Sequence, residues 1–234
     1  MPPIIITTLS PLQKSQIQSM NSTFPVDEAD LFVLFEIDGT IRSAAAFFSE
    51  GDDTYECYAF TDPAYRHQGL FSELLEIAIE TLPEDAEFLF YTNGTDPDTQ
   101  AALLALEAEL VFEEHMMEID LASSLTKAEK LSENPVTITS AAIEGTLTRR
   151  YSNPYGSVNI SVFSSHYYLY GLEIKEEYRG KGYGNQLFNQ VLLDLASLDP
   201  LPLRLQVSEN NIPAVSLYKK TGFQITETLF GYLY

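Results

Sequence analysis

The sequence predicts an α/β protein built from two tandem halves, each with a sheet flanked by helices. Residues 167–195 have the pattern of a strand, a glycine-rich loop and an amphipathic helix, and residues 54–82 repeat that order. A polar stretch, residues 122–134, separates the copies and ends before Pro135. With 234 residues, the chain is long enough for two small domains.

The second copy contains a loop suited to binding an anion. A predicted strand, Tyr167–Ile174, leads to a loop that contains three glycines and two basic residues: Arg179, Gly180, Lys181, Gly182, Tyr183 and Gly184. The first N–H groups of the following helix lack intrahelical partners, and the helix dipole favours negative charge there. Glycines let backbone N–H groups approach a phosphate closely. The loop is therefore predicted to hold a phosphorylated ligand.

Other interpretations of a glycine loop have to be weighed against this one. A turn that only joins a strand to a helix stays open on the loop alone. The dinucleotide-binding fingerprint does not fit, because no βαβ unit with a suitably placed acidic residue follows. The P-loop pattern does not fit either, because no Gly-Lys-Ser/Thr ends the loop.

A second segment, downstream of the loop, has the signals of a strand followed by a capped helix. Leu203–Val207 alternates like a strand, and a helical segment follows it. Asn210 or Asn211 can cap this helix. Pro213 suits its first turn, and Gly222 can end it.

The loop and the downstream helix together resemble the GNAT acetyltransferase superfamily. The loop matches the family's coenzyme A signature, Arg/Gln-x-x-Gly-x-Gly/Ala, and the helix matches Asn-x-x-Ala-x-x-x-Tyr-x-x-x-Gly-Phe. The residues of the second match are Asn211, Ala214, Tyr218, Gly222 and Phe223. The resemblance is clearest in roughly the last third of the chain. It implies two tandem GNAT-like domains, each a mixed, mostly antiparallel twisted sheet flanked by helices.

The resemblance also implies where acetyl-coenzyme A binds. The cofactor would lie in a splayed gap between two strands, with its pantetheine arm paired to the backbone near Leu172 and Ile174. The loop amides from Arg179 to Gly184 would hold the pyrophosphate, and Lys220 is one of the basic groups such a site needs. Asn211 would help to orient the pantetheine end.

Two catalytic roles follow from the same resemblance. Tyr218 would lie near the thioester sulfur and donate a proton as the thiolate leaves; the alternative is a tyrosine that only packs. The sequence does not identify the general base. Glu173 lies on the strand beside the site, but it fits a solvated strand residue equally well. Gln206 stands where some family members carry a glutamate base, and a water chain would also serve.

Strand alternation allows a prediction about the faces of Tyr167–Ile174. Successive side chains of a strand point to opposite faces, so Glu173 is expected on the face opposite Leu172 and Ile174. Tyr168 and Tyr170 are expected on the same face as those two residues.

The first copy lacks parts of this site. Aligned on Gly69, it has His67 and Phe71 where the second copy has the first and last glycines of its loop. Phe71 would place a bulky side chain where the backbone should approach phosphate. The predicted helix Asp98–Glu109 contains no tyrosine and no Asn-x-x-Ala-x-x-x-Tyr pattern. The predicted organisation is a degenerate domain at 1–122, a linker at 123–134 and a competent domain at 135–234.

Charge separates the two halves in the same way. Residues 1–120 contain 24 acidic and three basic residues, which accounts for the whole net charge of −21, whereas residues 121–234 contain ten of each. A field of that sign in the first half would repel the phosphates of coenzyme A. The net charge argues against nucleic acid and anionic membranes as partners, and it suits a cationic acceptor such as a polyamine. An acidic surface that only maintains solubility is the alternative.

The composition argues against disulfide bonds, a zinc site and a membrane span. The single cysteine, Cys57, excludes an internal disulfide framework and reads as a small buried residue rather than a nucleophile. Three scattered histidines give no zinc set, so no metal is expected. No apolar run reaches the length of a membrane span, and the N-terminus lacks a secretory pattern. A cytoplasmic setting is expected.

The leading hypothesis is an enzyme that transfers an acetyl group from acetyl-coenzyme A to a primary amine of a small molecule by direct attack. Its second domain would be active, and the first structural or acceptor-shaping. A non-catalytic acyl-coenzyme A-binding regulatory module and a purely structural tandem fold are the alternatives. The protein would be a monomer or a homodimer.

A group of tyrosines either lines an acceptor pocket or packs on half-buried strands: Tyr151, Tyr155, Tyr167, Tyr168 and Tyr170.

Overall fold

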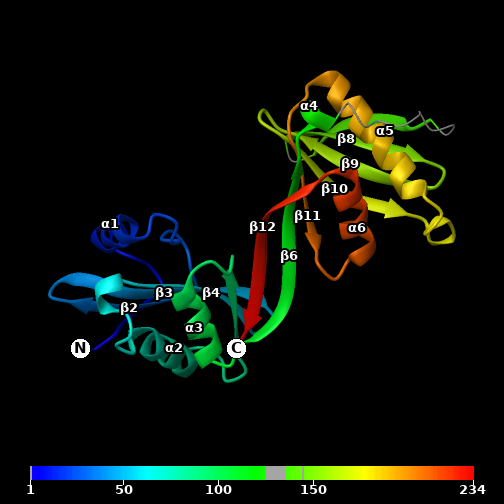
Figure 1. Cartoon of the computed structure of the whole chain (residues 1–234). Helices are drawn as coiled ribbons and strands as arrows, with labels where there is room; N and C mark the ends of the chain where they lie inside the picture. The colour runs from blue at the N-terminus through cyan, green and yellow to red at the C-terminus, as the bar shows by residue number, and fades with distance from the viewer. Residues whose placement is uncertain (1, 125–134, 144) are drawn as a thin grey trace. The chain divides into compact units, whose positions relative to one another are not determined.

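The computed structural model describes residues 2–124, 135–143 and 145–234, and it divides into two compact units (Figure 1). Unit 1 consists of Met1–Phe112 and Phe230–Tyr234, and unit 2 consists of Glu113–Leu229. These units do not coincide with the expected ranges, because the C-terminal residues belong to unit 1. Most of the expected linker, residues 125–134, lies outside the described residues.

Unit 1 is a mixed sheet between helices. Its strands have the order β1-β2-β3-β4-β5-β12, in which only β4 and β5 pair in parallel. The elements, in chain order, are β1 (Ile4–Ile6), α1 (Pro11–Met20), β2 (Leu31–Ile37), β3 (Thr40–Gly51), β4 (Thr54–Thr61), the 3₁₀ turn η1 (Pro63–Tyr65), α2 (Leu70–Thr81), β5 (Glu87–Thr92), α3 (Pro97–Ala105) and the end of β12 (Gln224–Leu233).

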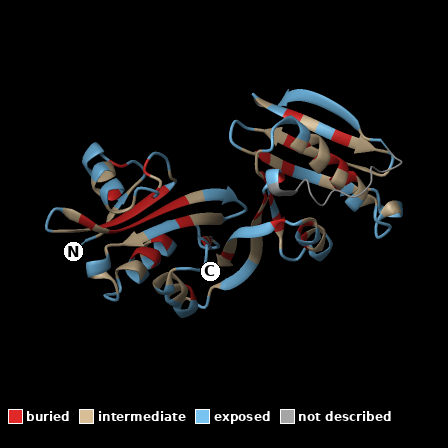
Figure 2. Ribbon diagram, turned by 45° about the horizontal axis from the view of Figure 1, so that its top comes forward, coloured by how far each residue is buried: buried red, intermediate tan, exposed pale blue. Residues whose placement is uncertain are grey.

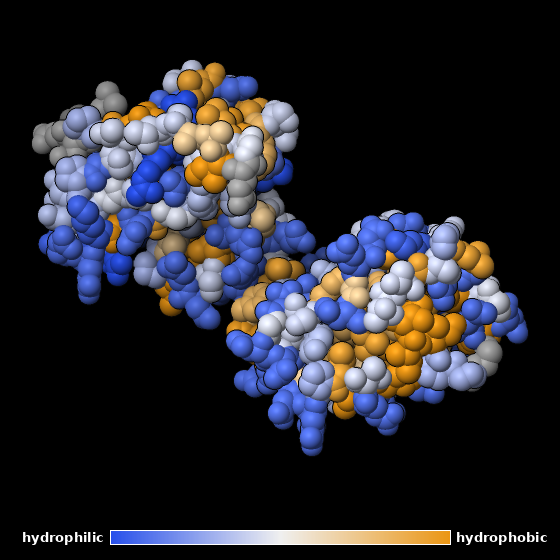
Figure 3. Space-filling model, turned by 180° about the vertical axis from the view of Figure 1, so that it is seen from behind, coloured by the Kyte–Doolittle hydropathy of each residue, from blue (hydrophilic) through white to orange (hydrophobic). Residues whose placement is uncertain are grey.

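Alternating side chains give unit 1 a core on each face of its sheet. Val33 and Phe47 face the cluster that includes Leu74 of α2, whereas Phe32 faces the cluster that includes Ile17 of α1. Figure 1 shows α1 on one side of the sheet and α2 with α3 on the other. Figure 3 shows that unit 1 also presents an apolar area to solvent, and its exposed apolar residues include Tyr58, Tyr91 and Leu110.

Unit 2 is a second mixed sheet, with strand order β6-β11-β10-β9-β8-β7, and only β10 and β11 pair in parallel. The elements are β6 (Glu109–Ile119, in unit 2 from Glu113), α4 (Leu121–Ser124), β7 (Thr137–Ile143), β8 (Thr146–Asn153), β9 (Gly156–Val162), β10 (Tyr167–Ile174), the 3₁₀ turn η3 (Glu176–Tyr178), α5 (Tyr183–Leu198), β11 (Leu203–Ser208), α6 (Ile212–Thr221) and the first part of β12.

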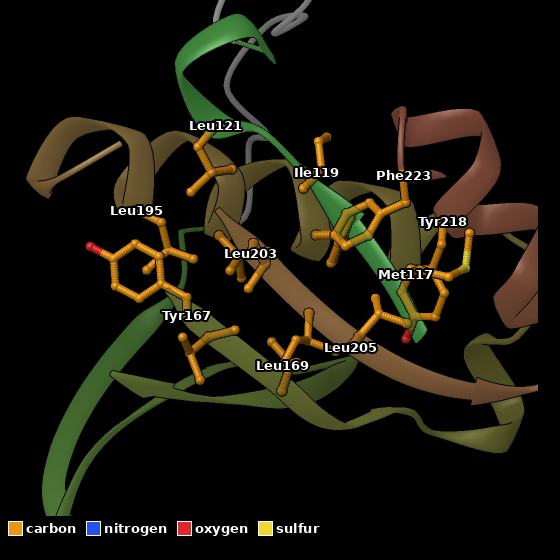
Figure 4. Close-up of a cluster of buried hydrophobic side chains, with 14 of the residues drawn as sticks. Met117, Ile119, Leu121, Tyr167, Leu169, Leu195, Leu203, Leu205, Tyr218 and Phe223 are labelled. Atoms are coloured by element: carbon orange, nitrogen blue, oxygen red, sulfur yellow. The ribbon is translucent and has the colours of Figure 1, made fainter. Parts of the chain in front are cut away.

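The helices α5 and α6 share one apolar core. Phe188 of α5 and Tyr218 of α6 pack in the same cluster as Leu205 of β11 and Met117 of β6 (Figure 4). Figure 2 shows the buried residues concentrated on the strands and on the inner sides of these helices. Because both helices follow parallel strands, they begin at the same edge of the sheet, and this edge is where the predicted site lies.

The predicted fold class is confirmed, with local differences. The strand β8 is not anticipated by the sequence, because Arg149 and Arg150 interrupt its apolar alternation. Its buried residues are Thr148 and Tyr151, and the hydroxyl of Tyr151 donates a hydrogen bond of 2.6 Å to Asp194 of α5. Helix α3 ends at Ala105, four residues before the expected Glu109.

The closing strands explain why the units differ from the expected domains. The end of β12 pairs with β5, with Phe230 opposite Thr92, so the last residues of the chain complete the sheet of unit 1. The second half of β6 pairs with β11, with Ile119 opposite Leu203, and completes the sheet of unit 2. Each compact unit therefore contains a strand that the sequence order assigns to the other half.

Candidate functional site

The strands β10 and β11 separate at the predicted cofactor gap. They pair at three positions, from Tyr167 opposite Leu203 to Leu169 opposite Leu205, and the parallel ladder ends there. The remainder of β10 stays paired with β9 on its other side. Beyond Leu169, the edge of β10 that faces β11 is therefore not paired with β11, and an extended ligand can add to it like a strand.

A β-bulge lies at the point of separation. The register with β9 shifts between Tyr170 and Glu173, and Gly171 within the bulge has a φ of 60°. A residue with a side chain is strained at positive φ, so glycine is suited to this position. The bulge turns backbone groups of β10 out of the regular ladder, next to the gap.

The bulge makes one expectation about faces wrong. Leu172 and Ile174 pack against the same core as Tyr167 and Leu169, and they do not share the face of Tyr168 and Tyr170. One inserted residue reverses the alternation of the side chains that follow it. Simple alternation along the sequence could not reveal this reversal.

The glycine loop begins α5 in the geometry expected for an anion site. Gly180 and Gly182 have φ values of 70° and 84°, and a Cβ at either position would meet no atom within 4 Å. Space outside the loop is therefore open. Arg179 Nε donates to the carbonyl of Ile174 at 2.9 Å, and Lys181 Nζ donates to the carbonyl of Glu177 at 2.7 Å. Both basic groups thus stay close to the loop.

Gly184 differs from the other two loop glycines, because its missing side chain would point into the unit. A Cβ there would lie 3.5 Å from Ile174 Cγ1 and 4.0 Å from Leu217 Cδ2. These are ordinary contacts, so a methyl group fits at this position. A large side chain would extend into the region where α5, α6 and the end of β10 converge.

Three tyrosines support the loop. Tyr183 opens α5 and stacks on Tyr155 of the β8–β9 turn, with ring centroids 3.8 Å apart. Tyr178, just before the loop, packs edge-on against both rings, at 4.9 Å and 5.7 Å. The backbone N–H of Lys175 also donates to the carbonyl of Tyr155 at 2.9 Å. The sequence does not predict this cluster, because Tyr155 lies more than 20 residues before the loop.

The helix α6 presents the residues of the second motif. Asn211 caps the helix, with Oδ1 accepting from the N–H of Ala214 at 3.3 Å. Tyr218 is 5% exposed and packs against Phe188 and Phe223, and burial raises its pKa to about 12. Lys220 lies in the last turn, roughly 13 Å along the helix from Asn211 by the rise per residue. The structure therefore brings Asn211, but not Lys220, to the edge where α5 begins.

The two positions considered for a general base lie on the other face of the sheet. Glu173 is exposed and paired with Ser157, on the face opposite the core. Gln206 is also exposed, and its side-chain amide donates to the carboxylate of Glu114. Neither group points toward the core that holds Tyr218.

A buried histidine near the gap is a feature that the sequence motifs do not single out. His115 of β6 lies 2.6 Å from Glu209, through Nε2 and Oε2, and 2.9 Å from the hydroxyl of Thr228, through Nδ1. The three residues are far apart in sequence, so only the strand pairing brings them together.

The first copy keeps the backbone of the loop. Gly69 has φ 84° and ψ −1°, the same values as Gly182, and His67 has a φ of 58° where the second copy has Gly180. Arg66 Nε donates to the carbonyl of Thr61 at 3.2 Å, as Arg179 does to the corresponding strand end. The loop conformation therefore persists without the full set of glycines.

The surroundings of that first loop are different. Asp98 of α3 accepts from Arg66 Nη1 at 2.7 Å and lies 3.6 Å from His67 Nε2. The ladder between β3 and β4 runs without a bulge from Ser43 opposite Thr61 to Phe48 opposite Glu56.

Phe71 does not point where the sequence alone suggests. Its ring packs edge-on against Phe90 of β5, with centroids 6.3 Å apart, and belongs to the margin of the core of unit 1. The β4–β5 ladder ends at Glu56 opposite Leu89, so Phe90 lies just beyond the last pair. Phe71 therefore fills the region of separating strands rather than covering the loop amides.

Two of the five tyrosines proposed for an acceptor pocket are buried inside unit 2. Tyr151 is fully buried, and Tyr167 is 3% exposed and donates to the carbonyl of Asp199 at 3.1 Å. Tyr170 is exposed, at 37%. In unit 1, Cys57 is buried and its thiol pKa is raised by burial, so it packs as a small apolar residue.

Among the described residues, no group of three or more histidine, cysteine, aspartate or glutamate side chains is arranged to hold a metal ion. In the part of the chain that the structure describes, no helix has both the length and the apolar character needed to cross a bilayer.

Comparisons with known proteins agree with this architecture. Residues 9–107 and 109–223 each match the family model described as "Acetyltransferase (GNAT) family". No curated protein sequence matches the chain significantly.

Solved structures show the same fold at low identity. A tandem GNAT protein from the clavulanic acid biosynthesis pathway is 11% identical, with a TM-score of 0.64 over 100% of this chain and 98% of that one. A GCN5-related N-acetyltransferase from Sphaerobacter thermophilus is 13% identical, with a TM-score of 0.58 over 94% and 84% of the two chains. A GNAT-family acetyltransferase from Colwellia psychrerythraea is 14% identical, with a TM-score of 0.56 over 99% of each chain.

Proposed function

Since the chain belongs to the acetyltransferase (GNAT) family, we propose that unit 2 transfers an acetyl group from acetyl-coenzyme A to a primary amine of a small cationic molecule. Unit 2 combines the separated strands, the bulge at Gly171 and the open glycine loop. Unit 1 has a structural role in this proposal, because Phe71 fills the corresponding region of its sheet.

The observation that carries the proposal is the contrast between Gly184 and Phe71. Both follow loops of the same backbone conformation, so the fold provides the same helix N-terminus in each unit. Unit 1 has the ring of Phe71 at this position, whereas unit 2 has a glycine, where an added Cβ would contact Ile174 and Leu217 at 3.5–4.0 Å. A linear pantetheine arm needs space there to pair with the edge of β10.

Each motif residue has a physical task in this proposal. The N–H groups from Arg179 to Gly184 bind the pyrophosphate, helped by the dipole of α5. The cap at Asn211 fixes the start of α6 beside the pantetheine end. Tyr218 keeps its proton at neutral pH, as any tyrosine does, and burial raises its pKa further, so it is protonated when the thiolate departs and can donate to it.

The negative charge of the chain indicates which class of acceptor molecule to expect. The whole excess of negative charge lies in residues 1–120, and an acidic protein attracts cations. A free amine attacks the thioester directly, because no exposed cysteine is available to form an acyl-enzyme.

A non-catalytic acyl-coenzyme A-binding module is the second candidate. It is favoured by the positions of Glu173 and Gln206, which both lie away from the face of Tyr218. Such a module would bind the cofactor as proposed and would transfer no acetyl group.

Isothermal titration with acetyl-coenzyme A tests the proposal. Wild type should bind one equivalent, and Gly182→Glu should lose binding, because a carboxylate at the helix N-terminus would compete with the pyrophosphate. Gly69→Glu is the matched control, since Gly69 has the same φ and ψ and the same open surroundings. Equal loss in both variants, or no binding by wild type, would reject the assignment of the cofactor to unit 2.

Turnover separates the two candidates. A panel of primary amines that includes polyamines should release free coenzyme A thiol, measured with a thiol reagent. Saturable binding without acetyl transfer to any amine would favour the regulatory module.

A further inference from the structure

His115, Glu209 and Thr228 form a hydrogen-bonded group in unit 2 that the roles above leave unused. Both ring nitrogens of His115 have a side-chain partner, Glu209 at 2.6 Å and Thr228 at 2.9 Å. The imidazole is 6% exposed and the Glu209 side chain 47% exposed. A buried imidazole is costly unless its nitrogens are hydrogen-bonded, so this arrangement fixes the ring.

The group lies beside the predicted reaction site. His115 is opposite Val207, on the part of β11 that has separated from β10. It shares a face of β6 with Met117, which belongs to the buried cluster of Tyr218 (Figure 4). The imidazole is therefore on the same face of the sheet as the proposed proton donor.

Glu209 connects this group to the start of α6. It directly follows β11, and its N–H donates to the carbonyl of Glu113 at 2.9 Å, which continues the pairing with β6. Asn211, the cap of α6, comes two residues later. The carboxylate thus lies at the edge of the sheet where the cofactor gap opens.

The carboxylate of Glu209 is held at one oxygen only. Oε2 bonds to His115, and no described residue donates a hydrogen bond to Oε1. Since the side chain is about half exposed, a solute can reach Oε1. Glu113 is the other carboxylate near the ring, with Oε1 4.0 Å from His115 Nε2. A base held by a second residue, itself held by a third, is the arrangement that proton-transfer sites use.

We propose that Glu209 is the general base that accepts a proton from the acceptor ammonium group, and that His115 and Thr228 are positioning residues. This inference rests on the proposed acetyl transfer in unit 2, and it replaces Glu173 and Gln206 as candidates. Histidine Nε2 donates to Glu209, and Thr228 holds the ring in the orientation this bond needs.

The acceptor R–NH₃⁺ gives one proton to Glu209, which passes it to solvent. The free amine attacks the thioester carbonyl, so that a C–N bond forms and the C–S bond breaks. Tyr218 donates a proton to the departing sulfur and is reprotonated by the second proton that leaves the nitrogen. The products are the N-acetylated amine, coenzyme A and one proton.

Glu209→Gln tests the base directly. The substitution keeps the size of the side chain and an oxygen for His115, so acetyl-coenzyme A affinity should stay within about twofold of wild type. The value of kcat/KM should fall by about 10²-fold or more, the usual contribution of a positioned base. Glu227→Gln is the matched control, because Glu227 is an exposed carboxylate of β12 next to Thr228 and lies outside the hydrogen-bonded group. It should retain wild-type kinetics.

Chemical rescue and a conservative variant test the positioning roles. Added formate should restore part of the activity of Glu209→Ala, since it supplies a carboxylate, and should not restore Tyr218→Phe. His115→Ala should lower kcat with KM nearly unchanged, and His115→Gln, which keeps a donor for Glu209, should recover much of it. A purely structural histidine would show no such recovery.

The outcomes distinguish this inference from the proposed function. If wild type neither binds acetyl-coenzyme A nor acetylates any amine, both are overturned. If wild type is active and Glu209→Gln keeps the kinetics of Glu227→Gln, the proposed function stands and Glu209 is not the base.

Discussion

The two glycine loops, residues 65–70 and 178–183, have the same backbone conformation and different surroundings. Gly69 and Gly182 agree in φ and ψ, and an arginine in each copy caps the end of the preceding strand. Unit 1 adds an ion pair with Asp98 and the ring of Phe71, whereas unit 2 has a bulge and Gly184. A loop of this shape is therefore a property of the fold, and the capacity to hold a cofactor depends on a few side chains around it.

Two residues of the first copy differ from the second in ways that affect the space around the loop. His67 shows that a residue with a side chain can occupy the left-handed region at the first loop position, at some cost in strain. Phe71 shows that a packed ring can use the space a ligand would need and stabilise the core. Both features can be exchanged between the units by substitution.

Gly184→Phe should have the largest effect, because it places the side chain of the first copy into the second. A phenyl ring at this position would enter the region near Ile174 and Leu217, where the pantetheine arm is proposed to bind. Acetyl-coenzyme A affinity should fall by about 100-fold or more, equivalent to about 3 kcal/mol. Isothermal titration measures this change.

Gly184→Ala supplies the control for that substitution. Its methyl group would make contacts of 3.5 Å and 4.0 Å, which are ordinary, so the fold should be retained. Circular dichroism should be the same for both variants. If Gly184→Phe bound acetyl-coenzyme A as tightly as wild type, a packed ring at this position would not be what excludes the cofactor from the first copy, as proposed.

Tyr218→Phe should lower kcat by about 10- to 100-fold, because it removes only the proposed proton donor. Cofactor affinity should change little, since the phenyl ring still packs against Phe188 and Phe223. Burial raises the pKa of Tyr218 to about 12, so the hydroxyl keeps its proton in the folded enzyme up to about pH 11. The rate of wild type should therefore show no decline from this group between pH 8 and pH 10.

The dependence of kcat on pH tests the environment of the Tyr218 hydroxyl most directly. An acid whose pKa is raised in the folded state loses its proton only at higher pH than a free tyrosine, which titrates near 10. A decline in wild-type kcat centred near pH 10, absent in Tyr218→Phe, would show that the hydroxyl titrates normally and that its environment differs from the one described.

The sequence predicts local features of the site well because they depend on neighbouring residues. Gly180 and Gly182, the cap at Asn211 and the helix end at Gly222 all have the predicted conformations. Each follows from a backbone requirement that one residue type satisfies, such as positive φ or a side-chain acceptor at a helix start.

The other features of the fold and of the candidate site depend on pairing between strands that are distant in the sequence. The bulge at Gly171 reverses the expected faces, and no rule of alternation places it. The bond between His115 and Glu209 joins residues 94 positions apart. The exchange of closing strands depends on which edge is available to β12, and local sequence carries no information about that choice.

Gly180→His and His67→Gly form a reciprocal pair with a smaller expected effect. A side chain at a φ of 70° costs about 1 kcal/mol, so Gly180→His should lower acetyl-coenzyme A affinity by about fivefold. His67→Gly should relieve a similar strain in unit 1 and leave cofactor affinity unchanged. Titration measures the first effect, and thermal unfolding measures the second. Loss of all binding in Gly180→His would mean that the ligand itself needs the space of the missing side chain.

Asp98→Asn should have the smallest effect, and it tests whether charge or packing closes the first copy. The ion pair with Arg66 is partly exposed, with side-chain exposures of 35% and 40%, so its loss should change the free energy of unfolding by no more than about 1 kcal/mol. Acetyl-coenzyme A stoichiometry should stay at one, because Phe71 still packs against Phe90 and the net charge of the first half stays strongly negative. A second binding equivalent in Asp98→Asn would show that the carboxylate, through its ion pair with Arg66, is what keeps the first loop from holding phosphate.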